Sequence, residues 1–276
     1  MKKWLLLTGL MLFFCSSSYS AWKMRLISLV PSVTEILFAL ELDEEIVGVT
    51  TFCDYPEAAL KKDKIGSFSQ PDLERILSLN PDMVFVTDLE QAILIEKLKQ
   101  LGLNVYVCSP ATIEEILIEI ENIGEITGKI SQAKRLVKEM RSKIQNIEGK
   151  VRFIPEDKKQ KVFIEIWHEP LMTAGKGSFV DELIYLAGGI NIAKDVYRPY
   201  SYFSAEQVIK RNPDCIILGY MSQDMTGITV ATRIGWSDIN AVKNKRIYND
   251  IKTPLFLRPG PRIVEGLIQI HRRLYP

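Results

Sequence analysis

The chain lacks most of the short motifs by which enzymes and cofactor-binding proteins are found in a sequence. It has no Gly-x-x-x-x-Gly-Lys-Ser/Thr phosphate loop, no Gly-x-Gly-x-x-Gly after the first predicted strand, no Cys-x-x-Cys and no Gly-x-Ser-x-Gly elbow. Only two of the 276 residues are histidines, His168 and His271, which argues against a histidine cage for zinc or manganese. We therefore expect no catalytic residues, no cofactor and no metal site, and a protein that is not an enzyme.

An excess of charge of one sign is also missing. The 35 basic residues nearly balance the 34 acidic ones, so nothing in the charge predicts a nucleic-acid partner or an acidic membrane surface. After the cleavage predicted below, the cysteines are Cys53, Cys108 and Cys215, and an odd number is not a disulfide framework. Cys215 lies in an apolar strand and is expected to be a small core residue. Whether Cys53 pairs with Cys108 is left open.

The first twenty residues have the pattern of an export signal. Lys2 and Lys3 precede an apolar run from 4 to 14, and small residues lead to a cut before Ala21. The run is shorter than the roughly 20 residues that span a bilayer. We predict a signal peptide over 1–20 and a periplasmic protein, with a lipid anchor at Cys15 as the alternative.

What the chain does contain is an internal repeat. Asp72–Val86 and Ser204–Leu218, 132 positions apart, each read as a helix cap, a short amphipathic helix, an Asn-Pro-Asp turn and a buried strand. A weaker echo links Val33–Phe38 to Val180–Tyr185 at an offset of 147, so the first copy carries an insertion of 15 residues. A duplicated unit of this kind predicts two similar lobes.

Strand-length apolar runs alternate with helical patterns along the mature chain, which predicts an α/β fold with mainly parallel sheets. The strand candidates are Arg25–Val30, Ile46–Thr50, Met83–Thr87, Asn104–Ser109, Lys161–Trp167, Cys215–Gly219 and Arg246–Asn249.

One long helix is predicted between the lobes, at 131–148. Its apolar residues recur at alternating spacings of three and four, from Ile130 to Ile147, which places them on one face. It is either an ordinary surface helix of one domain or a bridge between the lobes. We predict a first lobe over 21–127, a bridging helix over 128–149 and a second lobe over 150–276, with a ligand cleft between the lobes.

Glu74 and Glu206 occupy the same place in the two repeats, two residues after a capping Asp72 or Ser204. A carboxylate in the first helical turn gains roughly 0.3–1 kcal/mol from the helix dipole, and this alone could explain each residue. Helix stability does not require the two to match, however, so we predict a pair of symmetric docking contacts. By contrast, Ser178 is expected to cap a helix with Asp181 as its partner rather than to act as a nucleophile. His271, next to Arg272 and Arg273, is expected to be solvated.

Aromatic residues lie in the loops that follow predicted strands or precede the two Glu helices, and loops at strand ends are where α/β sheets bind ligands. Phe52 follows one predicted strand, Trp167 and His168 follow another, and Phe68 and Tyr200 precede the two Glu helices. Packing of unrelated aromatics would give a similar pattern, but the pairing predicts a cleft for a large, flat or greasy ligand. Arg258 could add a hydrogen-bond fork or could simply be solvated.

These segments resemble the periplasmic binding proteins for cobalamin and ferric siderophores, which serve ABC importers. The resemblance covers nearly all of the mature chain and is carried by segments 25–35, 47–56, 73–82, 169–178 and 187–191. It implies two α/β lobes joined by a single rigid helix, and it is greatest toward the cobalamin-binding branch. It also implies that Glu74 and Glu206 pair with arginines of the two permease subunits.

The resemblance implies ligand contacts as well. Phe52, Phe68 and Tyr200 match aromatic positions that contact the corrin, although that branch has Tyr, Trp and Trp there. The segment from Pro254 through Phe256 to Arg258 matches a ligand-contacting loop, with Arg258 retained and an Asp replaced by Pro254. His168 has no clear counterpart and could approach the cobalt of a corrinoid or hydrogen-bond in the cleft.

The function expected from the sequence is therefore capture of cobalamin or a related corrinoid, and its delivery to an ABC permease by a monomeric binding protein. A ferric-siderophore or haem-type iron-complex receptor is the alternative in the same class. An enzyme on a related two-lobe scaffold is a third reading, which turnover of a ligand by the purified protein would support.

Overall fold

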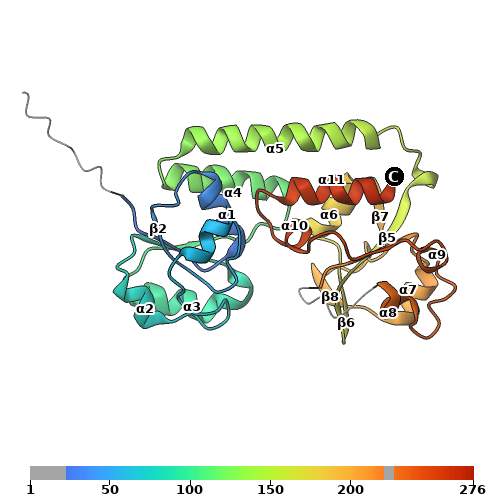
Figure 1. Ribbon diagram of the computed structural model, residues 1–276, viewed down its shortest axis with the longest axis horizontal. Helices are drawn as coiled ribbons and strands as arrows, with labels where there is room; N and C mark the ends of the chain where they lie inside the picture. The colour runs from blue at the N-terminus through green and yellow to red at the C-terminus, as the bar shows by residue number, and fades with distance from the viewer. Residues whose placement is uncertain (1–22, 221–226) are drawn as a thin grey trace, which may run out of the picture.

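Two α/β lobes lie side by side below one long helix in the computed structural model, which describes residues 23–220 and 227–276. That helix, α5 (Ile130–Val151), runs along both lobes in Figure 1. The predicted signal peptide and Cys15 lie outside the described residues. Within the described ranges, no helix combines the length and the apolar character needed to cross a membrane.

The first lobe is built on a four-stranded parallel sheet. The strand order is β2-β1-β3-β4, and β1 pairs in register with β3, Leu26 opposite Met83. The elements are β1 (Leu26–Ser28), α1 (Pro31–Ala39), β2 (Ile46–Val49), η1 (Glu57–Lys61), α2 (Leu73–Ser78), β3 (Met83–Val86), α3 (Asp88–Gln100), β4 (Val105–Val107) and α4 (Ile113–Ile126).

The second lobe repeats this order and extends it. Strands β7, β5, β9 and β10 are parallel neighbours, and β6 and β8 add an antiparallel edge. The elements are η2 (Glu156–Lys158), β5 (Gln160–His168), β6 (Leu171–Ala174), α6 (Phe179–Leu186), β7 (Gly189–Asn191), β8 (Tyr200–Tyr202), α7 (Ala205–Arg211), β9 (Cys215–Leu218), α8 (Gly227–Ala231), α9 (Asn240–Lys243), β10 (Ile247–Tyr248), α10 (Pro254–Leu257) and α11 (Ile263–Leu274). The seven predicted strands are confirmed, whereas β6, β7 and β8 were not predicted.

The sequence repeat is preserved down to single hydrogen bonds. Asp72 caps α2 by accepting from the backbone N–H of Arg75, and Ser204 caps α7 by accepting from that of Gln207. After the helices, Asp82 accepts from the Arg25 backbone N–H at 2.7 Å, and Asp214 accepts from that of Lys161 at 2.9 Å. Each aspartate thereby fixes the start of its own strand against the neighbouring strand.

Helix α5 packs through the face that the spacing predicted. Its buried residues are Ala133, Val137, Met140, Ile144 and Ile147. Ile130 is 45% exposed because it lies at the first position of the helix, beyond its neighbours. The buried face joins one hydrophobic cluster that includes residues of both lobes, such as Leu37 and Leu183. Burial of each large apolar side chain contributes roughly 1.5–3 kcal/mol, so the helix holds both lobes from one side.

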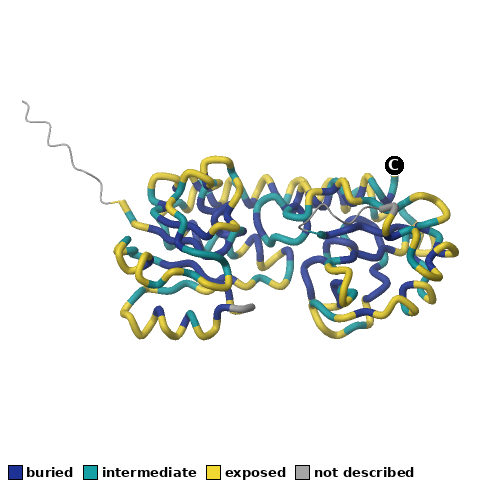
Figure 2. The backbone as a smooth tube through the Cα atoms, turned by 60° about the horizontal axis from the view of Figure 1, so that its bottom comes forward, coloured by how far each residue is buried: buried dark blue, intermediate teal, exposed yellow. Residues whose placement is uncertain are grey.

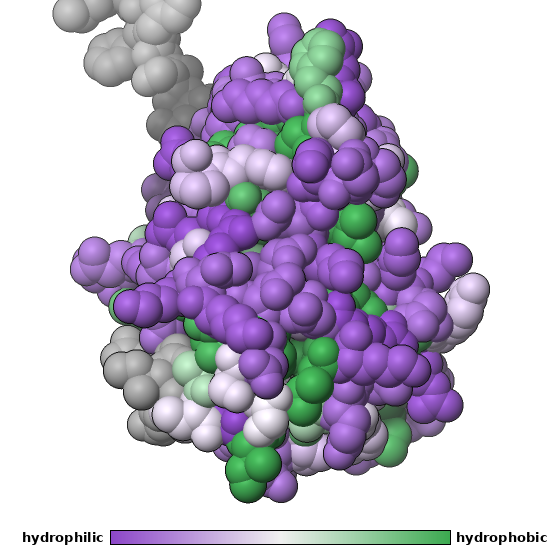
Figure 3. All heavy atoms as spheres, turned by 90° about the vertical axis from the view of Figure 1, so that its right-hand side faces the viewer, coloured by the Kyte–Doolittle hydropathy of each residue, from purple (hydrophilic) through white to green (hydrophobic). Residues whose placement is uncertain are grey.

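Burial follows the sheets in both lobes. Figure 2 shows buried segments inside each lobe and exposed ones along the outer helices and loops. The end face of the second lobe is mainly hydrophilic, with small scattered hydrophobic areas (Figure 3). Cys53, Cys108 and Cys215 are free and buried, and burial raises the pKa of the Cys215 thiol to about 12.

One residue outside the expected site differs from the sequence expectation. His271 is 9% exposed rather than solvated, because it lies on the inner face of α11, where its Nδ1 is 3.1 Å from the Ala187 carbonyl oxygen. Ser178 does cap α6 as predicted, accepting from the backbone N–H of Asp181.

Candidate functional site

Two cavities adjoin each other between the lobes, with volumes of about 750 and 630 Å³. Phe52, Leu257 and Arg258 line both of them, so these residues stand where the cavities meet. Together the cavities offer more room than the roughly 300–1,000 Å³ of pockets for drug-sized ligands. The fold thus leaves a cleft for one large ligand.

The smaller cavity is mainly apolar. It is lined from the first lobe by Val30–Ser32, Phe52, Phe68, Ser69, Thr87, Asp88 and Cys108–Ala111, and from the second by Gly177–Phe179, Pro199, Tyr200 and Leu257–Pro259. Val30, Phe52, Thr87 and Cys108 each follow a strand of the first sheet. They meet because the carboxyl ends of parallel strands lie at one edge, where open α/β sheets bind ligands.

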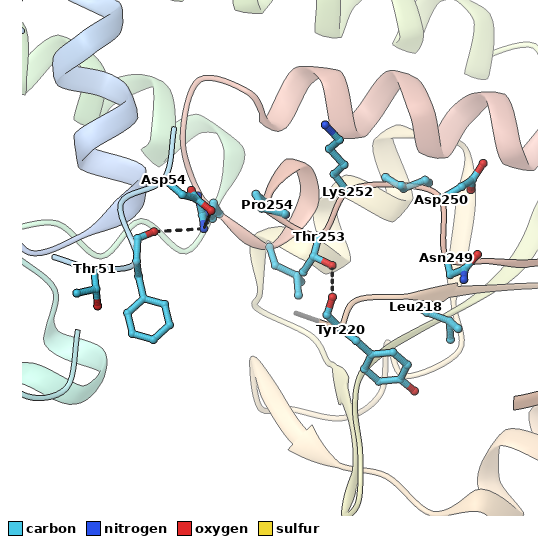
Figure 4. A pocket seen from close by; sticks show the side chains of 13 residues that line it. Thr51, Asp54, Leu218, Tyr220, Asn249, Asp250, Lys252, Thr253 and Pro254 are labelled. Atoms are coloured by element: carbon cyan, nitrogen blue, oxygen red, sulfur yellow. Dashed lines mark hydrogen bonds and ion pairs between the residues drawn. The ribbon is translucent and has the colours of Figure 1, made fainter. Parts of the chain in front are cut away.

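The larger cavity is the more polar of the two, although apolar side chains such as Leu218 and Leu257 also line it, and we call it the polar cavity. Thr51 and Asp54 face it from the first lobe, and Tyr220, Asn249 and the segment from Asp250 to Pro254 face it from the second (Figure 4). The Thr253 hydroxyl donates to the Tyr220 carbonyl oxygen at 2.7 Å, which ties the loop before α10 to the end of β9. A ligand in this cavity would meet hydroxyl, amide and backbone groups.

The charges that line the cleft are largely paired inside the protein. Arg258 donates to the Asp54 carboxylate at 2.6 Å and to the buried Glu35 carboxylate at 3.3 Å. Burial works to raise the pKa of Asp54, but the hydrogen bond and charge of Arg258 outweigh it and hold that pKa below its usual value. Asp250 pairs with Arg273. Lys252 at the polar cavity and Asp88 at the smaller one have no ion-pair partner among the described residues, so the pairing covers Asp54, Arg258 and Asp250 but not every charge of the lining.

Five of the eight predicted ligand-binding residues line the cleft. They are Phe52, Phe68, Tyr200, Pro254 and Arg258. Phe52 is 48% exposed, so its ring is available to a ligand. Burial raises the pKa of Tyr200 to about 12, and its phenol is neutral across the physiological range.

The other three lie elsewhere. Trp167 and His168 are exposed at the end of β5, with ring centroids 5.3 Å apart, and the His168 ring meets Tyr220 of the polar cavity edge-on at 5.8 Å. His168 is therefore next to the cleft wall. Phe256 is fully buried in the core, with its Cβ near Gly266 of α11 and its ring near Gly219 at the end of β9. The structure thus corrects the expectation of a ligand contact at Phe256.

Several lining residues escaped the sequence reasoning. Cys108–Ala111, Tyr220 and Asn249 follow strands of the structure. Cys108, Ser109 and Asn249 had been placed inside predicted strands, which end earlier, at Val107 and Tyr248. Gly177–Phe179 had been interpreted only as a helix start. Among the described residues, no group of three or more His, Cys, Asp or Glu side chains could hold a metal ion.

Glu74 and Glu206 are both exposed, on α2 and α7. These helices lie on the side of the lobes away from α5 (Figure 1). The backbone N–H of Glu206 and the Ser204 hydroxyl lower the pKa of the Glu206 carboxyl. An exposed apolar residue follows each glutamate by three positions, Leu77 at 40% and Ile209 at 36% exposure. Residues three apart share a helix face, so each lobe presents an acidic and an apolar group together.

Two similar lobes around a cleft, joined on one side by the long helix α5, are the arrangement of a two-lobe binding protein. Residues 26–252 match the family model described as periplasmic binding protein, and the chain belongs to this family. It is a substrate-binding protein of an ABC importer, does not act as an enzyme, and works outside the cytoplasmic membrane.

Individual relatives agree with this assignment. A Bacillus subtilis protein described as an uncharacterized ABC transporter substrate-binding lipoprotein, YvrC, is 35% identical over 257 residues, which are 91% of this chain and 80% of that protein. A Staphylococcus epidermidis structure described as a possible iron-binding periplasmic solute-binding protein is 32% identical, with a TM-score of 0.79 and coverage of 92% and 99%. The periplasmic vitamin B12-binding protein of Vibrio cholerae is 26% identical, with a TM-score of 0.78 and coverage of 91% and 96%.

Proposed function

We propose that this protein captures cobalamin or a related corrinoid between its lobes and delivers it to the permease of an ABC importer. The observation that carries the proposal is the division of the cleft into an apolar, aromatic cavity and a polar cavity with largely paired charges. A corrin is a large, flat macrocycle with an apolar face and a rim of uncharged amides. Ring faces suit the macrocycle, and hydroxyl, amide and backbone groups suit the rim.

The ligand contacts proposed are Phe52, Phe68 and Tyr200 toward the macrocycle, and Pro254 and Arg258 at the polar rim. Trp167 and His168 lie beside the polar cavity and are proposed to contact a ligand that extends past Tyr220. For His168 two roles stay open, a hydrogen bond in the cleft and approach to the cobalt. Identical cobalt absorption shifts in wild type and His168→Ala, titrated with aquocobalamin, would exclude the second.

Delivery is proposed to use Glu74 and Glu206 as contacts with the two permease subunits, and Leu77 and Ile209 beside them. A permease with two equivalent subunits could bind one such acidic and apolar surface on each lobe. The binding protein itself is proposed to be monomeric, and its export to depend on the signal over 1–20, with a lipid anchor at Cys15 as the alternative.

The alternative cargo is an iron complex, either a ferric siderophore or haem. It is favoured by the similarity to the S. epidermidis protein, whose description names possible iron binding. The two cargoes are separated by their spectra. The protein would be incubated with an equimolar mixture of cyanocobalamin, dicyanocobinamide, haemin and a ferric siderophore, and then separated from free ligand by gel filtration. A retained corrin spectrum supports the proposal, and a retained iron-complex spectrum with no corrin contradicts it.

A further inference from the structure

Glu35 is a buried carboxylate of the first lobe that two arginines of the second lobe bind together. Its exposed fraction is 4%, and it lies on α1. Arg262 donates through Nε to Oε2 at 2.8 Å and through Nη2 to Oε1 at 2.5 Å, while Arg258 donates through Nη1 to Oε1 at 3.3 Å. One carboxylate therefore holds two guanidinium groups at the boundary between the lobes.

The same arginines reach further into the first lobe. Arg258 donates to both oxygens of Asp54, at 2.6 and 3.3 Å, and its Nη2 lies 3.5 Å from the Phe52 carbonyl oxygen. The guanidinium of Arg262 lies 3.7 Å from the ring centroid of Tyr55. Arg258 thus binds the segment that contains Phe52 to the second lobe.

The second copy of the repeat makes the reciprocal contact. Glu182 of α6, which matches Glu35 in the sequence echo, accepts a hydrogen bond from the Ile113 backbone N–H of α4 at 2.6 Å. Each of the two glutamates therefore reaches into the opposite lobe. Of the two, Glu35 alone binds a residue of the cleft lining, since Arg258 lines both cavities and Ile113 lines neither.

A buried carboxylate has two effects on Arg258. It helps to fix the planar guanidinium, because the single contact from Nη1 to Glu35 adds to the two-nitrogen contact that Arg258 makes with Asp54, and together they leave little rotational freedom. It also removes the attraction of that guanidinium for a ligand anion, since the charge is already compensated in a site where solvent screens little. Both effects act where the apolar and polar cavities meet.

We propose that Glu35 is a positioning residue that sets the charge preference of the ligand cleft. It holds Arg258 between itself and Asp54, so that the cleft accepts ligands with an uncharged amide rim in preference to ligands with free carboxylates. This inference rests on the proposed function, since it explains how a cleft with an arginine in its lining would favour a corrinoid.

The test compares two probes of different charge. Dicyanocobinamide is a corrinoid with amides at its rim, and haemin is a similar flat macrocycle with free propionates. The affinities of both would be measured for wild type and Glu35→Gln. Loss of the Glu35 charge leaves Arg258 under-compensated, so the affinity for haemin relative to dicyanocobinamide should rise about tenfold, the effect of one added charge-assisted contact.

Three further variants keep the test decisive. Asp54→Asn removes the other counter-charge of Arg258 at a half-exposed position, and it should shift the ratio in the same direction even if Glu35→Gln fails to fold. Glu35→Asp retains the charge and should bring the ratio back toward the wild-type value. Glu114→Gln is the control. It breaks a bidentate ion pair with Arg141, with distances of 2.7 and 2.5 Å, away from the cleft lining, and should leave the ratio unchanged.

An unchanged ratio in folded Glu35→Gln overturns the inference, because a merely structural role would weaken both probes alike. If Glu35→Gln does not fold, an unchanged ratio in Asp54→Asn overturns it. The proposed function fails separately, if wild type does not bind dicyanocobinamide. In that case the haemin measurements still report on Glu35, and an equal haemin affinity in wild type and in both variants would overturn its role.

Discussion

Asn80 and Asn212 turn the chain through the left-handed region of backbone space at the same point of the two repeats, with φ values of 44° and 47°. Asparagine tolerates this conformation better than most residues. Each turn ends a short helix and leads through Pro-Asp into a buried strand. The two glutamates that precede them, Glu74 and Glu206, therefore occupy equivalent places on equivalent lobes.

Reversal of both charges, in Glu74→Lys with Glu206→Lys, should reduce transport in a reconstituted importer by at least about tenfold while the ligand Kd changes by less than about twofold. The reason is that both residues are exposed and lie outside the cleft lining. A matched control is Glu139→Lys with Glu148→Lys, two exposed positions on α5. Loss of ligand binding in the first pair, or equal loss of transport in the second, would count against the docking assignment.

Polar substitution of the apolar neighbours, Leu77→Ser with Ile209→Ser, should weaken docking by roughly three- to tenfold, since each exposed side chain contributes about 1 kcal/mol or less at the edge of an interface. Docking would be measured as binding of the ligand-loaded protein to the permease in lipid nanodiscs. Leu60→Ser with Ile118→Ser is the control, which changes the same residue types at somewhat more exposed positions. If both pairs behave alike, Leu77 and Ile209 are ordinary surface residues.

The aromatic lining should carry much of the ligand affinity. Phe52→Ala should weaken corrinoid binding by roughly tenfold to a hundredfold, because a large apolar contact worth about 1.5–3 kcal/mol is lost. Isothermal titration calorimetry measures the change. Phe153→Ala, at an exposed phenylalanine after α5, is the control and should bind as wild type does. An affinity of Phe52→Ala within twofold of wild type would remove Phe52 from the site.

Phe256 should behave in the opposite way. Its ring is fully buried, so Phe256→Ala should lower the free energy of unfolding by about 3–5 kcal/mol through lost burial and a new cavity. Urea denaturation of this variant would be compared with that of Phe52→Ala, for which we expect a change of less than about 1 kcal/mol because Phe52 is half exposed. Equal destabilisation of the two variants would contradict the positions described for them.

Tyr200 gives a prediction for high pH. Burial raises its pKa to about 12, above the roughly 10 of an unfolded tyrosine. A group whose pKa is raised by folding contributes stability that is present below the unfolded pKa and is lost as the pH rises through the folded pKa. Burial also raises the pKa of Tyr106 to about 12, so ultraviolet titration of the folded protein should show one phenolate fewer near pH 12 in Tyr200→Phe than in wild type. If Tyr200→Phe instead loses a phenolate that ionises near pH 10, Tyr200 is not buried as described.

The sequence predicted much of this fold because its signals are local. The Asp72 and Ser204 caps, the Asn turns and the apolar strands act over a few residues, and a duplicated pattern strengthens each copy. Strands β6 and β8 were missed because they are only four and three residues long, and antiparallel pairing, of β6 with β5 and of β8 with β6, decides their structure. The prediction of a solvated His271 was wrong because it was based on the charged neighbours Arg272 and Arg273, whereas His271 lies on the inner face of α11.

The site was predictable only where side chains follow strands. Phe52 could be placed in this way, and Phe68 by its position before a Glu helix, whereas Phe256 could not, because the turn of α10 decides which side of a short helix faces the cleft. Glu35 pairs with Arg258 and Arg262, which are more than 220 positions away, and no local sequence pattern predicts such a contact. The fold alone brings these three charges together.

The measurement that tests the central claim most directly is calorimetric titration of the purified protein with cyanocobalamin, beside haemin and a ferric siderophore under the same conditions. The account predicts one corrinoid bound per chain with a Kd of about 1 μM or lower, and at least about tenfold weaker binding of the iron complexes. Absence of corrinoid binding, together with tight binding of an iron complex, would contradict it.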